Sequence, residues 1–190
     1  MNYALISAAI EYITRLFAGN SGGHDFEHSM RVYRLALQIA EKEKCDSTVV
    51  ALAALLHDAD DYKLFNTTDN DNARVFLKGR GVESGTIDKI CEAINSVSFS
   101  KNGINKPKTI EGMIVQDADR LDALGAVGIA RTFAYGGEHG RSIESTIDHF
   151  HKKLLLLKDG MNTETARRMA ESRHAFMEEY LAQYEKEKGL

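Results

Sequence analysis

The chain has little proline, few cysteines and no tryptophan. Its 190 residues include one proline, where an average composition would supply roughly nine or ten. Proline interrupts helices and is common in turns, so its scarcity favours a chain made mostly of helices. The content of 43% hydrophobic and 27% charged residues excludes a disordered chain and a collagen-like repeat.

The two cysteines, Cys45 and Cys91, are too few and too far apart for a disulfide scaffold or a CxxC metal knuckle. They indicate a reducing compartment, and we expect a cytoplasmic protein. The net charge of −4 provides no general positive field for a nucleic acid polymer.

Long hydrophobic runs are also absent, because no stretch approaches the roughly 20 apolar residues of a membrane span. The apolar run at residues 3–10 has no basic segment before it and continues into Glu11 and Arg15, which argues against a signal peptide. We therefore expect no membrane partner.

Apolar residues recur at spacings of three and four along most of the chain, which predicts an all-α fold of about eight helices. The expected helices span residues 2–17, 25–43, 48–57, 69–79, 84–96, 109–135, 143–158 and 163–188. A chain of this length buries about 70% of its unfolded surface, enough for one core. We expect a single domain over residues 1–190.

Particular residues mark the expected boundaries of these helices. Asp69 can cap the short helix that ends at Gly79, and residues 97–108, with Pro107, are expected to form a loop. The long pattern at 109–135 is expected to bend near Asp117 and to stop at Tyr135-Gly136-Gly137.

Histidines and aspartates gather in three short segments, at residues 24–28, 55–61 and 116–122. In the second and third segments the ionisable residues directly follow a strongly apolar run. Burial of an unpaired carboxylate costs several kcal/mol, and a shared cation would offset that cost. His57, Asp58 and Asp61 are spaced so that a helix would direct all three toward one side. The pattern predicts a metal site.

His28, then His57-Asp58, then Asp119 in Ala118-Asp119-Arg120-Leu121 resemble the H…HD…D signature of the HD-domain metal-dependent phosphohydrolase superfamily. The segments GHDFEHSMRV, LAALLHDADDYK, IVQDADRLDALGAVGIARTFAYGG and HFHKKLLLLKDGMNTETARRMA resemble the small single-domain bacterial HD hydrolases. The resemblance implies a helical HD-domain bundle with the metal-site core at about 20–135 and the helices of 143–188 packed on it.

The resemblance implies that His28, His57, Asp58 and Asp119 are the metal ligands. No histidine lies between His57 and His139, where two-metal and three-metal HD enzymes carry further ligands. We therefore expect one divalent ion, which argues against the di-iron oxygenases and cyclic-di-GMP phosphodiesterases of the superfamily. Two imidazoles with two carboxylates suit Mn, Fe, Co, Ni or Zn, with Mg also allowed, better than Ca.

The resemblance also implies hydrolysis of a phosphate ester or phosphoanhydride by a metal-activated water, with a small nucleotide as the substrate. A (deoxy)nucleoside triphosphate pyrophosphohydrolase or a nucleotidase fits best. Related HD nucleotidases carry an acid at the position of Asp61, which we expect to act in acid–base catalysis or to position water. Lys63, just beyond the acidic cluster, is the candidate for binding a substrate phosphate, although a surface lysine fits the same position.

Three further residues are candidates near the substrate. His24 lies one turn before His28 and can orient a ligand or contact phosphate, although a loop residue without a role fits equally well. The segment 131–141, which we expect to form a loop after the long helix, combines three glycines with Arg131 and Arg141, a composition that suits phosphate binding. Arg131 can instead complement a helix dipole.

Several alternatives remain open at the level of the sequence. Guanosine tetraphosphate hydrolases carry HDxxED, where this chain has Asp61 and Tyr62 at the last two positions. A non-catalytic helical module stabilised by its ion is a third interpretation. Asp117 and Asp122 fit the polar face of a helix or the support of a ligand from behind. The N-terminal helix can cover the core or pair with a second copy, so either a monomer or a homodimer is expected.

Overall fold

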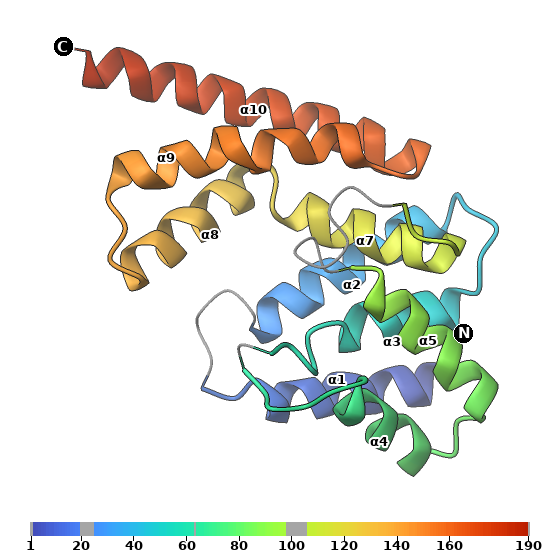
Figure 1. Ribbon diagram of the computed structural model, residues 1–190. Coiled ribbons are helices and arrows are strands. Elements are labelled where there is room, and N and C mark those ends of the chain that lie inside the picture. The colour runs from blue at the N-terminus through green and yellow to red at the C-terminus, as the bar shows by residue number, and fades with distance from the viewer. Residues whose placement is uncertain (1, 20–24, 63, 98–105, 190) are drawn as a thin grey trace.

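A computed structural model describes residues 2–19, 25–62, 64–97 and 106–189 (Figure 1). Within these ranges the chain forms nine α-helices, one 3-10 helix and no strand, which confirms the all-α prediction. The α-helices are α1 (Tyr3–Leu16), α2 (Phe26–Ala40), α3 (Ser47–Leu56), α4 (Asp71–Gly79), α5 (Ser84–Asn95), α7 (Ile110–Asp122), α8 (Gly125–Glu138), α9 (Ile143–Lys152) and α10 (Glu164–Lys188). The 3-10 helix η1 spans Leu154–Gly160.

Polar side chains cap most of these helices at their first turn. A side-chain oxygen accepts a hydrogen bond from a backbone N–H at the start of six helices, which satisfies a donor that has no partner inside the helix. The capping residues are Asn2, Asp25, Asp46, Thr109, Ser142 and Thr163. The polar residues that precede each apolar pattern therefore set where the helices begin.

Helix α3 lies at the centre of the hydrophobic core, as its nearly uniform apolar sequence predicts. Every residue from 49 to 56 is buried, and α1, α2, α5 and α7 all pack against this helix. Figure 1 shows α8, α9 and α10 gathered on one side of the molecule, α1, α3, α4 and α5 on the other, and α2 and α7 between them. The end of α3 therefore lies beside the two middle helices.

The predicted helix at 109–135 is in fact two helices, and its predicted bend near Asp117 is wrong. α7 ends at Asp122, and α8 begins at Gly125, whose φ of +72° is strained for any residue with a Cβ. Asp117 lies inside α7 and is buried. Its carboxylate accepts hydrogen bonds at 2.8 Å from the backbone N–H groups of Asn162 and Thr163, at the start of α10.

The predicted stop at Tyr135-Gly136-Gly137 is also wrong, because α8 continues through both glycines to Glu138. A Cβ at Gly136 would lie 2.6 Å from the Oγ1 atom of Thr146 on α9. Gly136 therefore allows two helices to approach closely, and it does not end one.

Two other boundaries differ from the predictions. The helix expected at 143–158 ends at Lys152 and gives way to η1. Asp69 does not cap α4, because both Asp69 and Asn70 adopt left-handed backbone angles, and the carboxylate of Asp60 caps this helix instead. Most of the loop expected at 97–108 lies outside the described residues. Among the helices that the structure does describe, none is both long and apolar enough to cross a membrane.

Candidate metal centre

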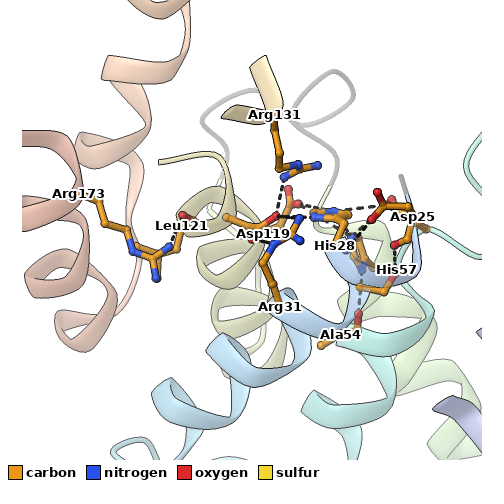
Figure 2. A network of polar contacts seen from close by, with 12 residues as sticks. Asp25, His28, Arg31, Ala54, His57, Asp119, Leu121, Arg131 and Arg173 are labelled. Atoms are coloured by element: carbon orange, nitrogen blue, oxygen red, sulfur yellow. Dashed lines mark hydrogen bonds and ion pairs between the residues drawn. The ribbon is translucent and has the colours of Figure 1, made fainter. Parts of the chain in front are cut away.

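The four residues predicted as metal ligands come from three separate segments, and Figure 2 shows three of them, His28, His57 and Asp119, gathered at one place. His28 lies in the first turn of α2, where Asp25 caps the helix by accepting a hydrogen bond from the His28 backbone N–H at 2.7 Å. His57 and Asp58 follow the end of α3, and Asp119 lies on α7. The central position of α3 brings its end against both other helices.

The side-chain donor atoms of these residues lie within a few ångströms of one another. His28 Nε2 and His57 Nε2 are 3.2 Å apart. Asp58 Oδ2 lies 3.5 Å from the first and 3.4 Å from the second. Asp119 Oδ1 lies 3.4 Å and 3.9 Å from the same two atoms. Donor atoms that share one ion at about 2.1 Å are separated by roughly 3.0–4.2 Å, so these separations suit a common ion.

The opposite edge of each imidazole faces a hydrogen-bond acceptor. His57 Nδ1 donates to the backbone oxygen of Ala54 at 2.8 Å, and His28 Nδ1 donates to Asp122 Oδ2 at 2.7 Å. A neutral imidazole with its proton on Nδ1 has a lone pair on Nε2. Two lone pairs that face each other repel unless a cation lies between them, so this donor set fits a metal ion.

The charges around His28 also favour a cation. Burial lowers the pKa of His28, but hydrogen bonds to Asp119 and Asp122 outweigh burial and raise the pKa to about 9. Burial raises the pKa of Asp119 and Asp122, yet the hydrogen bonds to His28 hold both pKa values below the usual range. The carboxylates stay ionised, and the centre attracts positive charge.

Asp122 holds His28 in place from the side away from the other ligands. Its side chain is only 2% exposed. It also accepts hydrogen bonds from Arg31 Nε at 2.7 Å and from Arg131 Nη1 at 2.6 Å. Of the two interpretations of Asp122 drawn from the sequence, the support of a ligand from behind is the one that the structure bears out.

Asp60 anchors the turn that carries His57 and Asp58. Its two carboxylate oxygens accept hydrogen bonds from the backbone N–H groups of Asn72 and Ala73 at 2.9 and 3.1 Å, in the first turn of α4. The Asn72 side chain in turn donates to the backbone oxygen of Ala59 at 2.8 Å. Asp60 therefore has a structural role, although it lies in the same acidic segment as Asp58.

The segment after α3 is not the helix that the spacing of His57 and Asp61 suggested. α3 ends at Leu56, and residues 57–60 form turns. Asp61 is half-buried, and its backbone N–H donates to the oxygen of Asp58 at 3.1 Å. Asp61 thus stays next to the centre through a turn, and its catalytic role remains a prediction.

The candidate substrate residues are less fully placed. His24 and Lys63 lie outside the described residues. Arg141 is exposed beyond the end of α8, and its guanidinium lies 5.1 Å from the centre of the Tyr135 ring. The segment 131–141 was expected to be a glycine-rich loop, but residues up to Glu138 belong to α8, so that expectation is wrong.

Three residues of this centre were missed by sequence reasoning or given no definite role: Arg31, Asp60 and Asp122. Arg31 follows His28 by three residues and Asp122 follows Asp119 by three, so in each pair one helical turn carries a predicted ligand and its supporting residue. That spacing could have predicted Arg31 and Asp122. No pattern in the sequence could have predicted the contact from Asp60 to α4, because it joins a turn to a separate helix.

Comparison with known proteins gives consistent results. Residues 25–124 match the HD domain family. The chain is 44% identical over 184 residues to the protein YpgQ of Bacillus subtilis, covering 93% of this chain and 90% of YpgQ. The crystal structure of that YpgQ in complex with ADP superposes with a TM-score of 0.81 at 41% identity, over 94% of this chain and 97% of that one.

The crystal structure of an HD-superfamily hydrolase from Bacillus thuringiensis superposes with a TM-score of 0.83 at 36% identity, over 100% of this chain and 99% of the other. These matches confirm the resemblance to small single-domain bacterial HD hydrolases. The matched segment contains His28, His57, Asp58 and Asp119, and it ends at the residue before α8.

Proposed function

The chain belongs to the HD domain family, and from that premise we propose that it is a metal-dependent phosphohydrolase acting on a small nucleotide. The bond cleaved is a phosphate ester or phosphoanhydride. The observation that carries the proposal is the pair of inward-facing Nε2 atoms of His28 and His57, 3.2 Å apart beside two carboxylates.

We assign His28, His57, Asp58 and Asp119 as ligands of one divalent ion, with Mn, Fe, Co, Ni and Zn as the best candidates and Mg allowed. When bound, such an ion makes a water molecule acidic and neutralises the charge that grows on phosphoryl oxygens. The side chain of Asp119 is 30% exposed and that of Asp58 only 9%. Substrate therefore approaches from the side of Asp119.

The chain's own residues orient the reaction. Hydrogen bonds at Nδ1 to Asp122 and Ala54 keep the Nε2 atoms of both imidazoles directed inward. Asp61, in the turn beside Asp58, accepts a proton from the attacking water or returns one to the leaving group at its carboxylate. His24, Lys63 and Arg141 contribute the positive charge or hydrogen bonds that hold substrate phosphate.

A nucleotide is the favoured substrate because YpgQ, 41% identical in its ADP complex, binds ADP. The net charge of −4 provides no general field for a polymer. A small phosphorylated molecule that reaches a local centre fits both observations better than DNA or RNA.

The test is a substrate panel with metal-free protein reloaded separately with Mn²⁺, Co²⁺ or Ni²⁺. The panel contains ribo- and deoxyribonucleoside mono-, di- and triphosphates together with guanosine tetraphosphate. We expect turnover of at least one nucleoside phosphate, loss of that turnover in Asp58→Ala, and retention in Asp148→Ala, an exposed carboxylate on α9. Equal turnover by wild type and Asp58→Ala would overturn the assignment.

The same panel separates the alternatives. Faster cleavage of guanosine tetraphosphate than of any nucleoside phosphate would favour the second enzyme function. If no substrate is cleaved and removal of metal unfolds the protein, the ion has a structural role, and the phosphohydrolase proposal fails.

A further inference from the structure

We propose that Arg131 is a positioning residue of the metal centre, which acts on His28 through Asp122 and makes α8 part of the site. The inference rests on the metal site of the proposed function. It extends that site beyond residues 25–124, the segment that matches the HD domain family.

His28 is held at both ring nitrogens by carboxylates from one helix. Asp119 and Asp122 are three residues apart on α7 and therefore share a face. Asp119 Oδ1 lies 3.4 Å from His28 Nε2, and Asp122 Oδ2 lies 2.7 Å from His28 Nδ1. The direction of the Nε2 lone pair therefore depends on where Asp122 is held.

Two arginines determine the position of the Asp122 carboxylate. Arg31 donates from Nε to Oδ1 at 2.7 Å and from Nη2 to Oδ2 at 3.2 Å. Arg131 donates from Nη1 to Oδ2 at 2.6 Å. The Oδ2 atom therefore accepts hydrogen bonds from His28, Arg31 and Arg131. Hydrogen bonds between charged groups are stronger than neutral ones, and the burial of Asp122 keeps water from replacing them.

Arg31 and Arg131 hold Asp122 from different helices, so their effects on its position differ. Arg31 lies one turn after His28 on α2 and moves together with it. Arg131 lies on α8, and its hydrogen bond joins Asp122 to a helix other than α2. It anchors Asp122 independently of the helix that carries the ligand, which fixes the angle between His28 and α7.

The backbone at the α7–α8 junction places Arg131 beside Asp122. A Cβ at Gly128 would lie 2.2 Å from the backbone oxygen of Ala123, so only glycine allows the first turn of α8 to pack against the end of α7. Arg131 follows Gly128 by three residues and shares its face of the helix. Arg173 on α10 donates to the oxygen of Leu121 at 2.5 Å and fastens the same junction (Figure 2).

Figure 2 shows Arg131 reaching the centre from the side opposite Ala54 and His57. Residues that support a metal ligand from behind typically change metal affinity by about 10–100-fold when they are removed. Arg131 is therefore expected to affect metal affinity even though it offers no ligand atom to the ion.

The test measures Mn²⁺ binding to the metal-free full-length protein by isothermal titration calorimetry, for wild type, Arg131→Gln, Arg131→Lys and Arg168→Gln. Arg168 is an exposed arginine on α10 paired with Glu164, and it serves as the matched control. We expect a Kd weaker by up to about 10-fold for Arg131→Gln, the lower end of the range for such partners because Arg31 still holds Asp122, recovery toward wild type in Arg131→Lys, and no change in Arg168→Gln.

A second measurement reports on His28 directly. In nitrogen-15 NMR spectra of the metal-free protein, the Nδ1–H signal of His28 is expected to shift in Arg131→Gln, whereas that of His57, bonded to Ala54, stays in place. A general structural defect would move both signals. If Arg131→Gln does not fold, Arg131→Met is used instead, because it keeps much of the length of the side chain, removes the charged donor to Asp122 and must also shift the His28 signal.

The outcomes separate this inference from the function on which it rests. If wild type binds no divalent ion, the metal centre itself is rejected. If wild type binds Mn²⁺ and Arg131→Gln binds it equally well, with an unshifted His28 signal, the positioning role of Arg131 is rejected and the metal centre stands.

Discussion

The Nε2 atoms of His28 and His57 face each other at 3.2 Å while the Nδ1 atom of each ring donates a hydrogen bond away from the other. In the metal-free protein a proton on His28 is the simplest way to relieve the repulsion between the two lone pairs. The hydrogen bonds to Asp119 and Asp122, which raise the pKa of His28 to about 9, also favour this proton. A metal ion and this proton therefore compete for the Nε2 atom of His28.

Metal binding near neutral pH is expected to release about one proton for each ion, because a ligand histidine must be neutral. Below pH 9, the apparent affinity for Mn²⁺ should fall about tenfold for each unit of pH. Calorimetric titrations in buffers of different ionisation enthalpy measure the proton count directly. If metal binding at pH 7.5 released no proton, the raised pKa of His28 would be contradicted.

The metal-free protein is expected to lose stability as the pH rises from about 6.5 to about 9. The pKa of His28 is raised from 6.5 to about 9 in the folded state, so protonation favours folding fully below the lower value. That contribution disappears as the pH passes through the higher value. Melting temperatures of the metal-free protein across this range, with Asp122→Asn as the comparison, should show the decline in wild type and a smaller one in the variant.

Asp122→Asn is expected to weaken Mn²⁺ binding by about 10–100-fold. The amide keeps the size of the side chain but removes the charge that attracts Arg31, Arg131 and the Nδ1–H group of His28. Asp148→Asn, which alters an exposed carboxylate on α9, is the control. Equal Mn²⁺ affinity in the two variants would show that Asp122 does not hold His28 for the metal.

Asp60→Ala is expected to destabilise the protein by about 0.5–2 kcal/mol, the usual cost of losing a helix cap. The two backbone N–H groups at the start of α4 lose their acceptor, and the turn that carries His57 and Asp58 loses its anchor. Urea unfolding measures the change in the free energy of unfolding. Asp60→Asn keeps an acceptor oxygen and should lie between wild type and the alanine variant; an alanine variant as stable as wild type would reject the cap.

Adjacent glycines on α8 give a matched pair. Gly136→Ala is expected to destabilise by about 1–3 kcal/mol, because the new Cβ would lie 2.6 Å from Thr146 Oγ1. Gly137→Ala meets nothing within 4 Å and should stabilise the helix by about 0.5–1 kcal/mol. Thermal unfolding compares the two, and similar changes in both would show that α8 and α9 do not pack closely at Gly136.

The sequence predicted the elements of this protein better than their junctions. The expected helix at 48–57 is α3 to within a residue at either end, because eight buried apolar residues between Asp46 and His57 leave no other structure. The bend predicted within 109–135 was placed near Asp117. Asp117 in fact pairs with the start of α10, a contact between residues 45 and 46 positions apart.

The candidate ligands were predictable because each is adjacent in sequence to the element that places it. His28 follows a helix cap, His57 and Asp58 follow an apolar helix, and Asp119 follows the apolar run of α7. What could not be predicted is which other groups reach them, since Asp60 to α4 and Arg131 to Asp122 are contacts between separate elements.

The sequence by itself determined the all-α class, the starts of most helices and the family to which the chain belongs, because caps, apolar periodicity and the H…HD…D spacing are local properties. Only the tertiary structure decided that α7 and α8 are separate, that Asp60 belongs to the fold, and that Arg131 joins the metal centre. Those outcomes depend on contacts between separate elements: Asp60 accepts hydrogen bonds from the first turn of α4, and the first turn of α8 approaches the end of α7 so closely at Gly128 that the distance to Ala123 leaves no room for a Cβ.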